Sequence, residues 1–460
     1  MPISIVVLAA GKGSRMLSTI PKVAHQLGGK PLLMHVIDSA CRLNPEEIIV
    51  VTGFEGEQVK SCLTPYLSNI STPIHWVDQK EQLGTGHAVQ QVLPILNKAN
   101  HTIILYGDVP LIKPETLRDM SQNPNPDVIN LLTVNLNDPT GYGRIIRNSE
   151  GDVERIVEHK DATPSEQDVS EVNTGIMALN GDRLVNLLDR INNNNAQNEY
   201  YLTDIIALHR GDNGSVITSQ PKSENEVQGI NTKLQLADLE REYQLEIANN
   251  LMAAGVTLSD PKRLDCRGNI KIGQDTFIDS NVVLEGDVSI GKNCTIEPGV
   301  IIRNSVIGDN CHLKAYSVLD DVRLDSHVKA GPFARLRPGT HLCEKAEIGN
   351  FVEIKKSKVG IASKAGHLSY LGDAEIGTNV NIGAGTITCN YDGANKHKTI
   401  LGDNVFIGSD TQLVAPVTVG DGATVGAGTT VTHDIPDENL AISRTKQRNL
   451  QGWKRPKKSS

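Results

Sequence analysis

Short apolar runs and helical patterns alternate along the first half of the chain. The apolar runs cover 3–8, 47–51 and 102–106, and residues 30–43 repeat apolar positions with helical spacing. Alternation of this kind is typical of βαβα units, which form a mainly parallel sheet with helices on both faces. The pattern therefore predicts an α/β domain over 1–230, with sites beyond the carboxyl ends of its strands.

The clearest helical pattern in the chain covers 231–252. Leu234, Leu239, Tyr243 and Leu251 recur among charged residues there, and Gly255 follows as a stop signal. We interpret 231–252 as a linker helix, which leaves a second domain over 253–460.

Aliphatic residues recur at every sixth position beyond Pro261. The series 272–302 and 401–431 each keep this step without interruption, and Ile307, Leu313 and Leu319 continue it between them. A sustained period of six predicts a parallel β-helix of hexapeptide repeats, with roughly nine coils between 272 and 436. The step is lost over 359–373 and 388–398, and we expect loops carrying function at these two segments.

Composition narrows the functional classes. A formal net charge of -9 argues against a general nucleic-acid binder. No apolar run reaches the roughly 18 residues of a membrane span, and residues 3–10 resemble a buried strand more than a signal peptide. Seven cysteines without a CxxC pair indicate reduced thiols, so we expect a cytoplasmic protein.

A glycine-containing loop follows the first apolar run directly. Residues 8–16 read Leu-Ala-Ala-Gly-Lys-Gly-Ser-Arg-Met, and Lys22 comes shortly after. Backbone N–H groups in such a loop can face a phosphate. The loop is neither a dinucleotide-binding fingerprint nor a Walker A motif. With Lys22 it closely resembles the entry motif of sugar-phosphate nucleotidyltransferases.

Further fragments of that family pattern follow in order. They occupy residues 79–88, 106–108, 141–145, 158–161 and 173–175. Over 1–453 the chain resembles the bacterial bifunctional N-acetylglucosamine-1-phosphate uridylyltransferase/glucosamine-1-phosphate acetyltransferases. Residues 192–204 nearly match a segment particular to these enzymes, with Asn198 where glycine is more usual. The resemblance implies a Rossmann-like nucleotidyltransferase domain with a mixed sheet, a left-handed parallel β-helix and a homotrimer. It also implies synthesis of UDP-N-acetylglucosamine, a precursor of peptidoglycan and lipopolysaccharide.

The same resemblance assigns the residues of the first reaction, in which UTP and N-acetylglucosamine 1-phosphate react with Mg²⁺ as cofactor. It assigns Mg²⁺ to Asp108 and Asn231. It implies that Gln79, Gly84 and Thr85 contact the uracil base and that Gly143, Glu158 and Asn173 hold the sugar. All residues expected to bind the nucleotide and the sugar are Leu8, Ala9, Ala10, Gly11, Lys22, Gln79, Gly84, Thr85, Tyr106, Gly107, Asp108, Gly143, Glu158, Asn173 and Asn231.

A histidine is the natural general base for the second reaction, acetylation of glucosamine 1-phosphate by acetyl-CoA, because the sugar amine must lose a proton before it attacks. We select His367, within the first break in period. By resemblance, the sugar phosphate would contact Arg337, Lys355, Tyr370 and Asn381. Acetyl-CoA would contact Ala384, Asn390, Tyr391, Ser409, Ala427 and Arg444.

Two other readings stay open at this point. The β-helix could only regulate or assemble a monofunctional nucleotidyltransferase. The chain could also be a non-catalytic scaffold, although the intact loop over 8–22 speaks against that. For acetyl transfer, Cys389 could carry an acetyl group, but direct transfer to the amine is favoured because nothing near that thiol clearly lowers its pKa.

Overall fold

The computed structural model describes residues 1–53, 55–68, 70–456 and 458. The chain forms two compact units, Met1–Tyr243 and Gln244–Ser460. The boundary between them along the sequence falls within the helix α8 (Lys233–Ala253), which covers most of the segment that we interpret as a linker. No helix in the described part of the chain is both long and apolar enough to cross a membrane.

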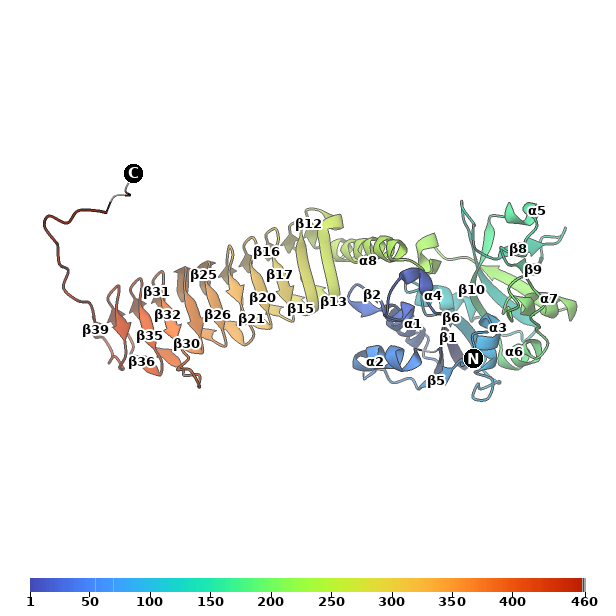
Figure 1. The fold of residues 1–460 in the computed structure, drawn as a ribbon, viewed down its shortest axis with the longest axis horizontal. Helices are drawn as coiled ribbons and strands as arrows, with labels where there is room; N and C mark the ends of the chain where they lie inside the picture. The colour runs from blue at the N-terminus through green and yellow to red at the C-terminus, as the bar shows by residue number, and fades with distance from the viewer. Residues whose placement is uncertain (54, 69, 457, 459–460) are drawn as a thin grey trace. The chain divides into compact units, whose positions relative to one another are not determined.

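A mixed sheet forms the centre of the first unit (Figure 1). Its central strands are parallel, whereas β10 runs antiparallel to both of its neighbours. The strand order is β11 (Ser215–Ser219), β7 (Val128–Asn135), β10 (Glu171–Asn180), β6 (His101–Tyr106), β1 (Ile3–Ala9), β4 (Glu47–Thr52) and β5 (Ile74–Asp78). β8 (Arg144–Arg147) pairs with β10 and with β9 (Val153–Val157).

Both faces of this sheet are covered, which explains why its central strands are apolar at successive positions. Ile5 and Val7 of β1 belong to one buried cluster, and Val6 and Leu8 belong to the other. Residues of α1 (Leu32–Cys41), α2 (Gly56–Leu67) and α4 (Pro114–Met120) join the first cluster. Residues of α3 (Thr85–Gln90), α6 (Gly181–Leu188) and α7 (Asp204–Gly211) join the second.

Short connecting elements complete the unit. They are η1 (Ser14–Met16), η2 (Lys22–Ala24), β2 (Gln26–Leu27), β3 (Lys30–Pro31), α5 (Pro164–Gln167) and η3 (Glu224–Val227). The helix expected over 30–43 thus starts later, because Lys30 and Pro31 pair with β2 instead.

The second unit is a parallel β-helix, which confirms the fold class predicted from the six-residue period (Figure 1). One face is the stack β12 (Thr257–Leu258), β14 (Phe277–Ile278), β16 (Thr295–Ile296), β19 (His312–Leu313), β22 (Lys329–Ala330), β25 (Glu347–Asn350), β28 (Lys364–His367), β31 (Asn381–Ile382), β34 (Phe406–Ile407), β37 (Thr424–Val425) and β39 (Leu440–Ala441).

The long strands β13 (Leu264–Ile272) and β15 (Val282–Ile290) begin the other two faces. One continues as β17 (Ile301–Arg303), β20 (Val318–Asp320), β23 (Arg335–Leu336), β26 (Glu353–Lys355), β29 (Tyr370–Gly372), β32 (Ile387–Cys389), β35 (Gln412–Val414) and β38 (Thr430–Val431). The other continues as β18 (Val306–Ile307), β21 (Val322–Leu324), β24 (Thr340–Leu342), β27 (Lys358–Val359), β30 (Ala374–Ile376), β33 (Thr399–Leu401) and β36 (Val417–Val419).

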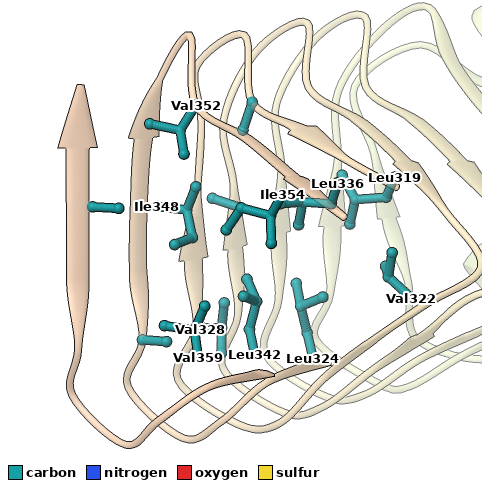
Figure 2. Packing of buried hydrophobic residues seen from close by; sticks show 14 of the residues in the cluster. Leu319, Val322, Leu324, Val328, Leu336, Leu342, Ile348, Val352, Ile354 and Val359 are labelled. Carbon is teal, nitrogen blue, oxygen red and sulfur yellow. The ribbon is translucent and has the colours of Figure 1, made fainter. Parts of the chain in front are cut away.

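Aliphatic side chains from successive coils stack inside the β-helix. Figure 2 shows Leu319, Leu336 and Ile354 in one such column, and all three side chains are fully buried. The coils are held together by parallel backbone pairing with the next coil, so each inward side chain has a neighbour above and below.

The prediction of a loop over 359–373 is wrong. Residues 364–367 and 370–372 form β28 and β29, which pair with the coils on either side. The period is hidden because the inward residue of β28 is Ala365, which is buried but small. The second break does contain an excursion, between β32 and β33, in which Tyr391 bridges to Lys396.

Candidate active sites

The glycine-containing loop leaves the carboxyl end of β1, at the middle of the sheet. Gly13 has φ of 59°, and a Cβ there would lie 2.7 Å from Cβ of Lys22. The position therefore needs glycine both for its left-handed backbone and for the close approach of Lys22. This turn brings Lys22 back beside the strand end.

Two hollows of ≈ 410 and ≈ 520 Å³, both lined by this loop, hold many of the residues predicted for the nucleotide. The larger hollow also contains Lys12, Gln82 and Glu199, which we did not assign. Predicted residues that line it are Leu8, Ala9, Ala10, Gly11, Lys22, Gln79, Gly84, Thr85, Tyr106 and Asp108.

The segment expected to read the base is held rigidly. Gln79 is buried, and its side-chain amide donates to the Gly84 carbonyl at 3.1 Å. Gly84 has φ of 110°, and a Cβ there would lie 2.6 Å from the Tyr200 carbonyl oxygen. Thr85 accepts a hydrogen bond from the Leu202 amide at 3.1 Å. Within residues 192–204, Tyr200 and Leu202 thus contact the segment that is expected to bind the base.

The two predicted metal ligands, Asp108 and Asn231, both contact the Lys22 ammonium. Asp108 forms an ion pair with Lys22, whose Nζ also donates to Oδ1 of Asn231 at 3.2 Å. Arg15 donates to the same Asn231 oxygen at 2.9 Å. A carboxylate and an amide oxygen that converge on a positive charge fit Mg²⁺, which takes oxygen ligands and completes its shell with phosphates and water.

The residues predicted for the sugar lie close to one another. The Asn173 amide donates to the Gly143 carbonyl at 2.8 Å, and a Cβ at Gly143 would lie 3.4 Å from Oε1 of Glu158. Burial raises the pKa of the Glu158 carboxyl, although the Thr203 hydroxyl donates to it at 3.0 Å. Burial also raises the pKa of Tyr106, whose ring contacts Gly175 and lines the hollow beside Asp108.

In the β-helix, His367 lies at the end of β28, exposed and in register with Asn350 of the preceding coil. Nδ1 of His367 is 2.7 Å from Oδ1 of Asn350. Because that oxygen can only accept, Nδ1 carries the proton, which leaves the Nε2 lone pair free. Asn350 is a residue that we did not assign, since its partner lies one coil away and not in the same motif.

Beyond His367 the same position of successive coils is occupied by small residues. β28 pairs with β31 through Ala365 and Ile382, which places Ala384 next to His367. The register of β31, β34 and β37 then aligns Ser409 and Ala427 with Ala384. Arg444 lies at the end of this row, where its side chain approaches Gly428 and Gly426. Four of the six residues predicted for acetyl-CoA, Ala384, Ser409, Ala427 and Arg444, therefore form a continuous strip that begins at the predicted base.

Three of the four residues predicted for the sugar phosphate, Arg337, Lys355 and Tyr370, lie on adjacent coils of the neighbouring face. Pairing of Leu336 with Ile354 places Arg337 beside Lys355, so two cations face one corner. Arg337 is also held by Glu353, which accepts from its Nη1 at 2.6 Å and which the sequence analysis did not single out. Tyr370 pairs with Glu353 on the next coil, and a Cβ at Gly372 would lie 2.4 Å from the Tyr370 hydroxyl.

Two predicted residues lie apart from this network. Tyr391 donates its hydroxyl to the Gly393 carbonyl at 2.5 Å, within its own loop, and the Lys396 ammonium lies 4.3 Å from its ring centroid. Asn381 is exposed on β31; among the described residues, no hydrogen bond joins its side chain to the rest of the set. Asn390, in contrast, is buried and donates to Asp373 at 2.5 Å.

Comparisons with known proteins agree with this organisation. Residues 5–139 match the model of the MobA-like NTP transferase domain. Residues 266–365 match the GMPPB C-terminal domain, and residues 398–433 match six repeats of the bacterial transferase hexapeptide. A crystal structure of UDP-glucose pyrophosphorylase complexed with UDP-glucose covers 53% of this chain and 98% of its own, at 18% identity and a TM-score of 0.45.

The matches to the NTP transferase domain and to the bacterial transferase hexapeptide support a transferase. The chain joins a nucleotidyltransferase domain to a β-helix of bacterial transferase hexapeptides.

Proposed function

We propose that this protein is a bifunctional enzyme of UDP-N-acetylglucosamine synthesis. The β-helix would transfer an acetyl group from acetyl-CoA to glucosamine 1-phosphate. The first unit would then join N-acetylglucosamine 1-phosphate to the uridylyl group of UTP and release pyrophosphate.

One observation carries the second activity. His367, with Nε2 free to accept a proton, begins a row of small residues that runs through Ala384, Ser409 and Ala427. A base at the end of a narrow strip suits a long, thin thioester cofactor that lies along the β-helix with its acetyl group at the histidine. A β-helix that served only for assembly would not need this combination.

Acetyl transfer then takes a simple course. Nε2 of His367 accepts a proton from the sugar amine, and the nitrogen attacks the thioester carbon. The C–S bond breaks, the coenzyme A thiolate takes up one of the two protons that the sugar ammonium loses, and the other passes from the imidazolium to solvent. Burial raises the pKa of the Cys389 thiol, which disfavours the thiolate that an acetyl-enzyme would need.

Uridylyl transfer depends on charge compensation, because an anionic sugar phosphate must attack the α-phosphate of UTP. Lys12, Arg15 and Lys22 supply positive charge around the cleft. When bound at Asp108 and Asn231, Mg²⁺ would neutralise further phosphate charge. Gly143, Glu158 and Asn173 would hold the sugar so that its phosphate points at the nucleotide.

The state of the cysteines fits a cytoplasmic enzyme. All seven cysteines are free, as expected in a reducing compartment. UTP, acetyl-CoA and sugar phosphates would be the partners, and the product would supply peptidoglycan and lipopolysaccharide synthesis.

Separate loss of the two activities tests the proposal. His367→Ala should reduce acetyl transfer by about 10²- to 10⁴-fold, the usual contribution of a general base, and leave uridylyl transfer near its original rate. Asp108→Ala should reduce uridylyl transfer by about 10²-fold or more and spare acetyl transfer. Each variant is assayed with acetyl-CoA plus glucosamine 1-phosphate, and with UTP plus N-acetylglucosamine 1-phosphate. Loss of both activities through one substitution, in a folded protein, would disprove the two-site assignment.

A further inference from the structure

One corner of the β-helix is lined by glycine in most coils. On the face that contains β18, β21 and β24, the residue after the inward aliphatic side chain is glycine in seven coils. These glycines are Gly273, Gly291, Gly308, Gly360, Gly377, Gly402 and Gly420. A Cβ would collide with the next coil here: at Gly308 it would lie 2.7 Å from the backbone carbon of Asp325. Side chains are therefore excluded unless the backbone makes room for them.

Two adjacent coils depart from this rule. Asp325 follows Leu324 of β21, and Cys343 follows Leu342 of β24, at the positions that hold glycine elsewhere. Their amides keep the ladder bonds of the corner, to Leu342 and Val359 at 2.9 Å each. The backbone thus stays regular while the two side chains occupy the column where the other coils have none.

A histidine completes the cluster. His341, on the outer side of β24, lies with Nε2 3.0 Å from Oδ2 of Asp325. The ligand atoms of Asp325, His341 and Cys343 all lie within 4.8 Å of one another. The Asp325 and His341 side chains are 31% and 35% exposed, so solvent reaches the cluster and both can adjust.

The Cys343 thiol differs from the other thiols of this region. Cys294 and Cys311 belong to the apolar core, and each donates to a backbone carbonyl, at 3.1 and 3.2 Å. Cys343 is buried but lies outside the core cluster, next to an imidazole and a carboxylate. Burial raises the pKa of this thiol, although Lys358 and Arg323 act in the opposite direction.

We propose that Asp325, His341 and Cys343 bind one Zn²⁺ ion, with water at the fourth position. A thiolate, an imidazole nitrogen and a carboxylate oxygen are the donor set that zinc prefers, and three protein ligands leave one position open. Bond lengths of about 2.0–2.3 Å require these side chains to close by about 1 Å. On binding, the thiol proton leaves to solvent, and His341 moves its ring proton to Nδ1 and binds through Nε2.

The charges around the cluster are compatible with this ion. A thiolate and a carboxylate neutralise Zn²⁺, while Arg323, which donates to Oδ1 of Asp325 at 3.3 Å, is 69% exposed and can turn to solvent. Zinc would link β21 to β24, and none of its ligands belongs to the residues proposed for acetyl transfer. The inference does not depend on the proposed function.

Cobalt substitution of the full chain tests the site. Chelator-treated protein is titrated with Co²⁺, and thiolate-to-cobalt charge-transfer absorption should appear with one ion per chain and disappear when Zn²⁺ is added. Cys343→Ser should abolish that absorption, and His341→Gln should weaken Co²⁺ binding at least about tenfold. Cys62→Ser, which removes a thiol from α2, is the matched control and should change neither.

The charge-transfer signal separates this site from any oxygen-ligand site for Mg²⁺, which gives no thiolate absorption. Absence of the band in the unsubstituted protein would overturn the proposal, as would a band that survives Cys343→Ser or is lost in Cys62→Ser. Far-ultraviolet circular dichroism of each variant confirms that it is folded, and a rise in the unfolding temperature of the unsubstituted protein with Zn²⁺ provides a second readout.

Discussion

At the scale of single residues, the side-chain oxygen of Asn350 fixes the tautomer of His367. It lies 2.7 Å from Nδ1 and keeps the proton there, so that Nε2 is the basic atom. His367 itself is exposed, and Asn350 is the hydrogen-bond partner that the described residues offer its ring. The amide therefore has a positioning role, which acts through the histidine and not through the substrate.

Asn350→Leu removes this acceptor and should lower kcat of acetyl transfer by about 10-fold or more, because a misoriented or wrong-tautomer base is a poor base. KM for glucosamine 1-phosphate should change little, since Asn350 does not contact the sugar phosphate corner. Asn350→Asp keeps an acceptor on Nδ1 and should restore most of kcat. The measurement is steady-state kinetics of the three proteins, and equal kcat for the original chain and Asn350→Leu would contradict the role.

At the scale of the elements, the β-helix is stabilised by columns of stacked aliphatic residues. Ile354 of β26 is fully buried between Leu336 and Leu371, which are fully buried too. Figure 2 shows Ile354 beside Leu336. Ile354→Ala removes several methyl and methylene groups between two coils that pairing holds in place. It should lower the free energy of unfolding by about 2–5 kcal/mol, measured by urea unfolding followed by circular dichroism.

The matched control is Val306→Ala, on the outer side of β18, where the side chain is 53% exposed. This substitution should change the free energy of unfolding by no more than about 0.5 kcal/mol. A loss below about 1 kcal/mol for Ile354→Ala would mean that the coils close over the space and that the column is not the stabilising unit.

The same columns show what sequence alone can predict of the fold. The six-residue period identifies which residues point inward, and the apolar runs 3–8 and 47–51 correspond to β1 and β4. Periodicity fails where a small residue such as Ala365 takes an inward position. It also cannot give coil length, because Leu319 lies 17 residues from Leu336 and Leu336 lies 18 residues from Ile354 in the stacked column.

Coil length decides which side chains meet, and this limits prediction of the sites. The pairs Asn350–His367 and Arg337–Glu353 join neighbouring coils, so no motif contains both partners. In the first unit, Lys22 meets Asp108 and Asn231 across 86 and 209 residues of chain. These assignments came from family resemblance, since spacing along the sequence says nothing about such distant partners.

At the scale of the whole molecule, one surface of the β-helix exposes a row of aromatic rings to solvent in a single copy of the chain. Tyr316, Phe333 and Phe351 stack along successive coils with ring centroids 5.4 and 5.3 Å apart, and they are 58%, 47% and 57% exposed. Leu368, 62% exposed, is adjacent to His367. All four have a left-handed backbone, φ between 50° and 57°, which is costly for such residues.

A row of exposed aromatic rings that ends beside the predicted base suits a surface covered by other copies of the chain, and we propose the homotrimer that the family resemblance implies.

Phe333→Ser combined with Phe351→Ser should convert trimers to monomers in light scattering after size exclusion. Acetyl transfer should fall with assembly because the exposed His367 loses its cover, whereas uridylyl transfer, in the other unit, should persist. Leu234→Ser, at a residue of α8 that is 78% exposed, is the control and should leave assembly and both activities unchanged. A double variant that stays trimeric, or an original chain that is monomeric at working concentration, would show that the row of aromatic rings does not hold copies together.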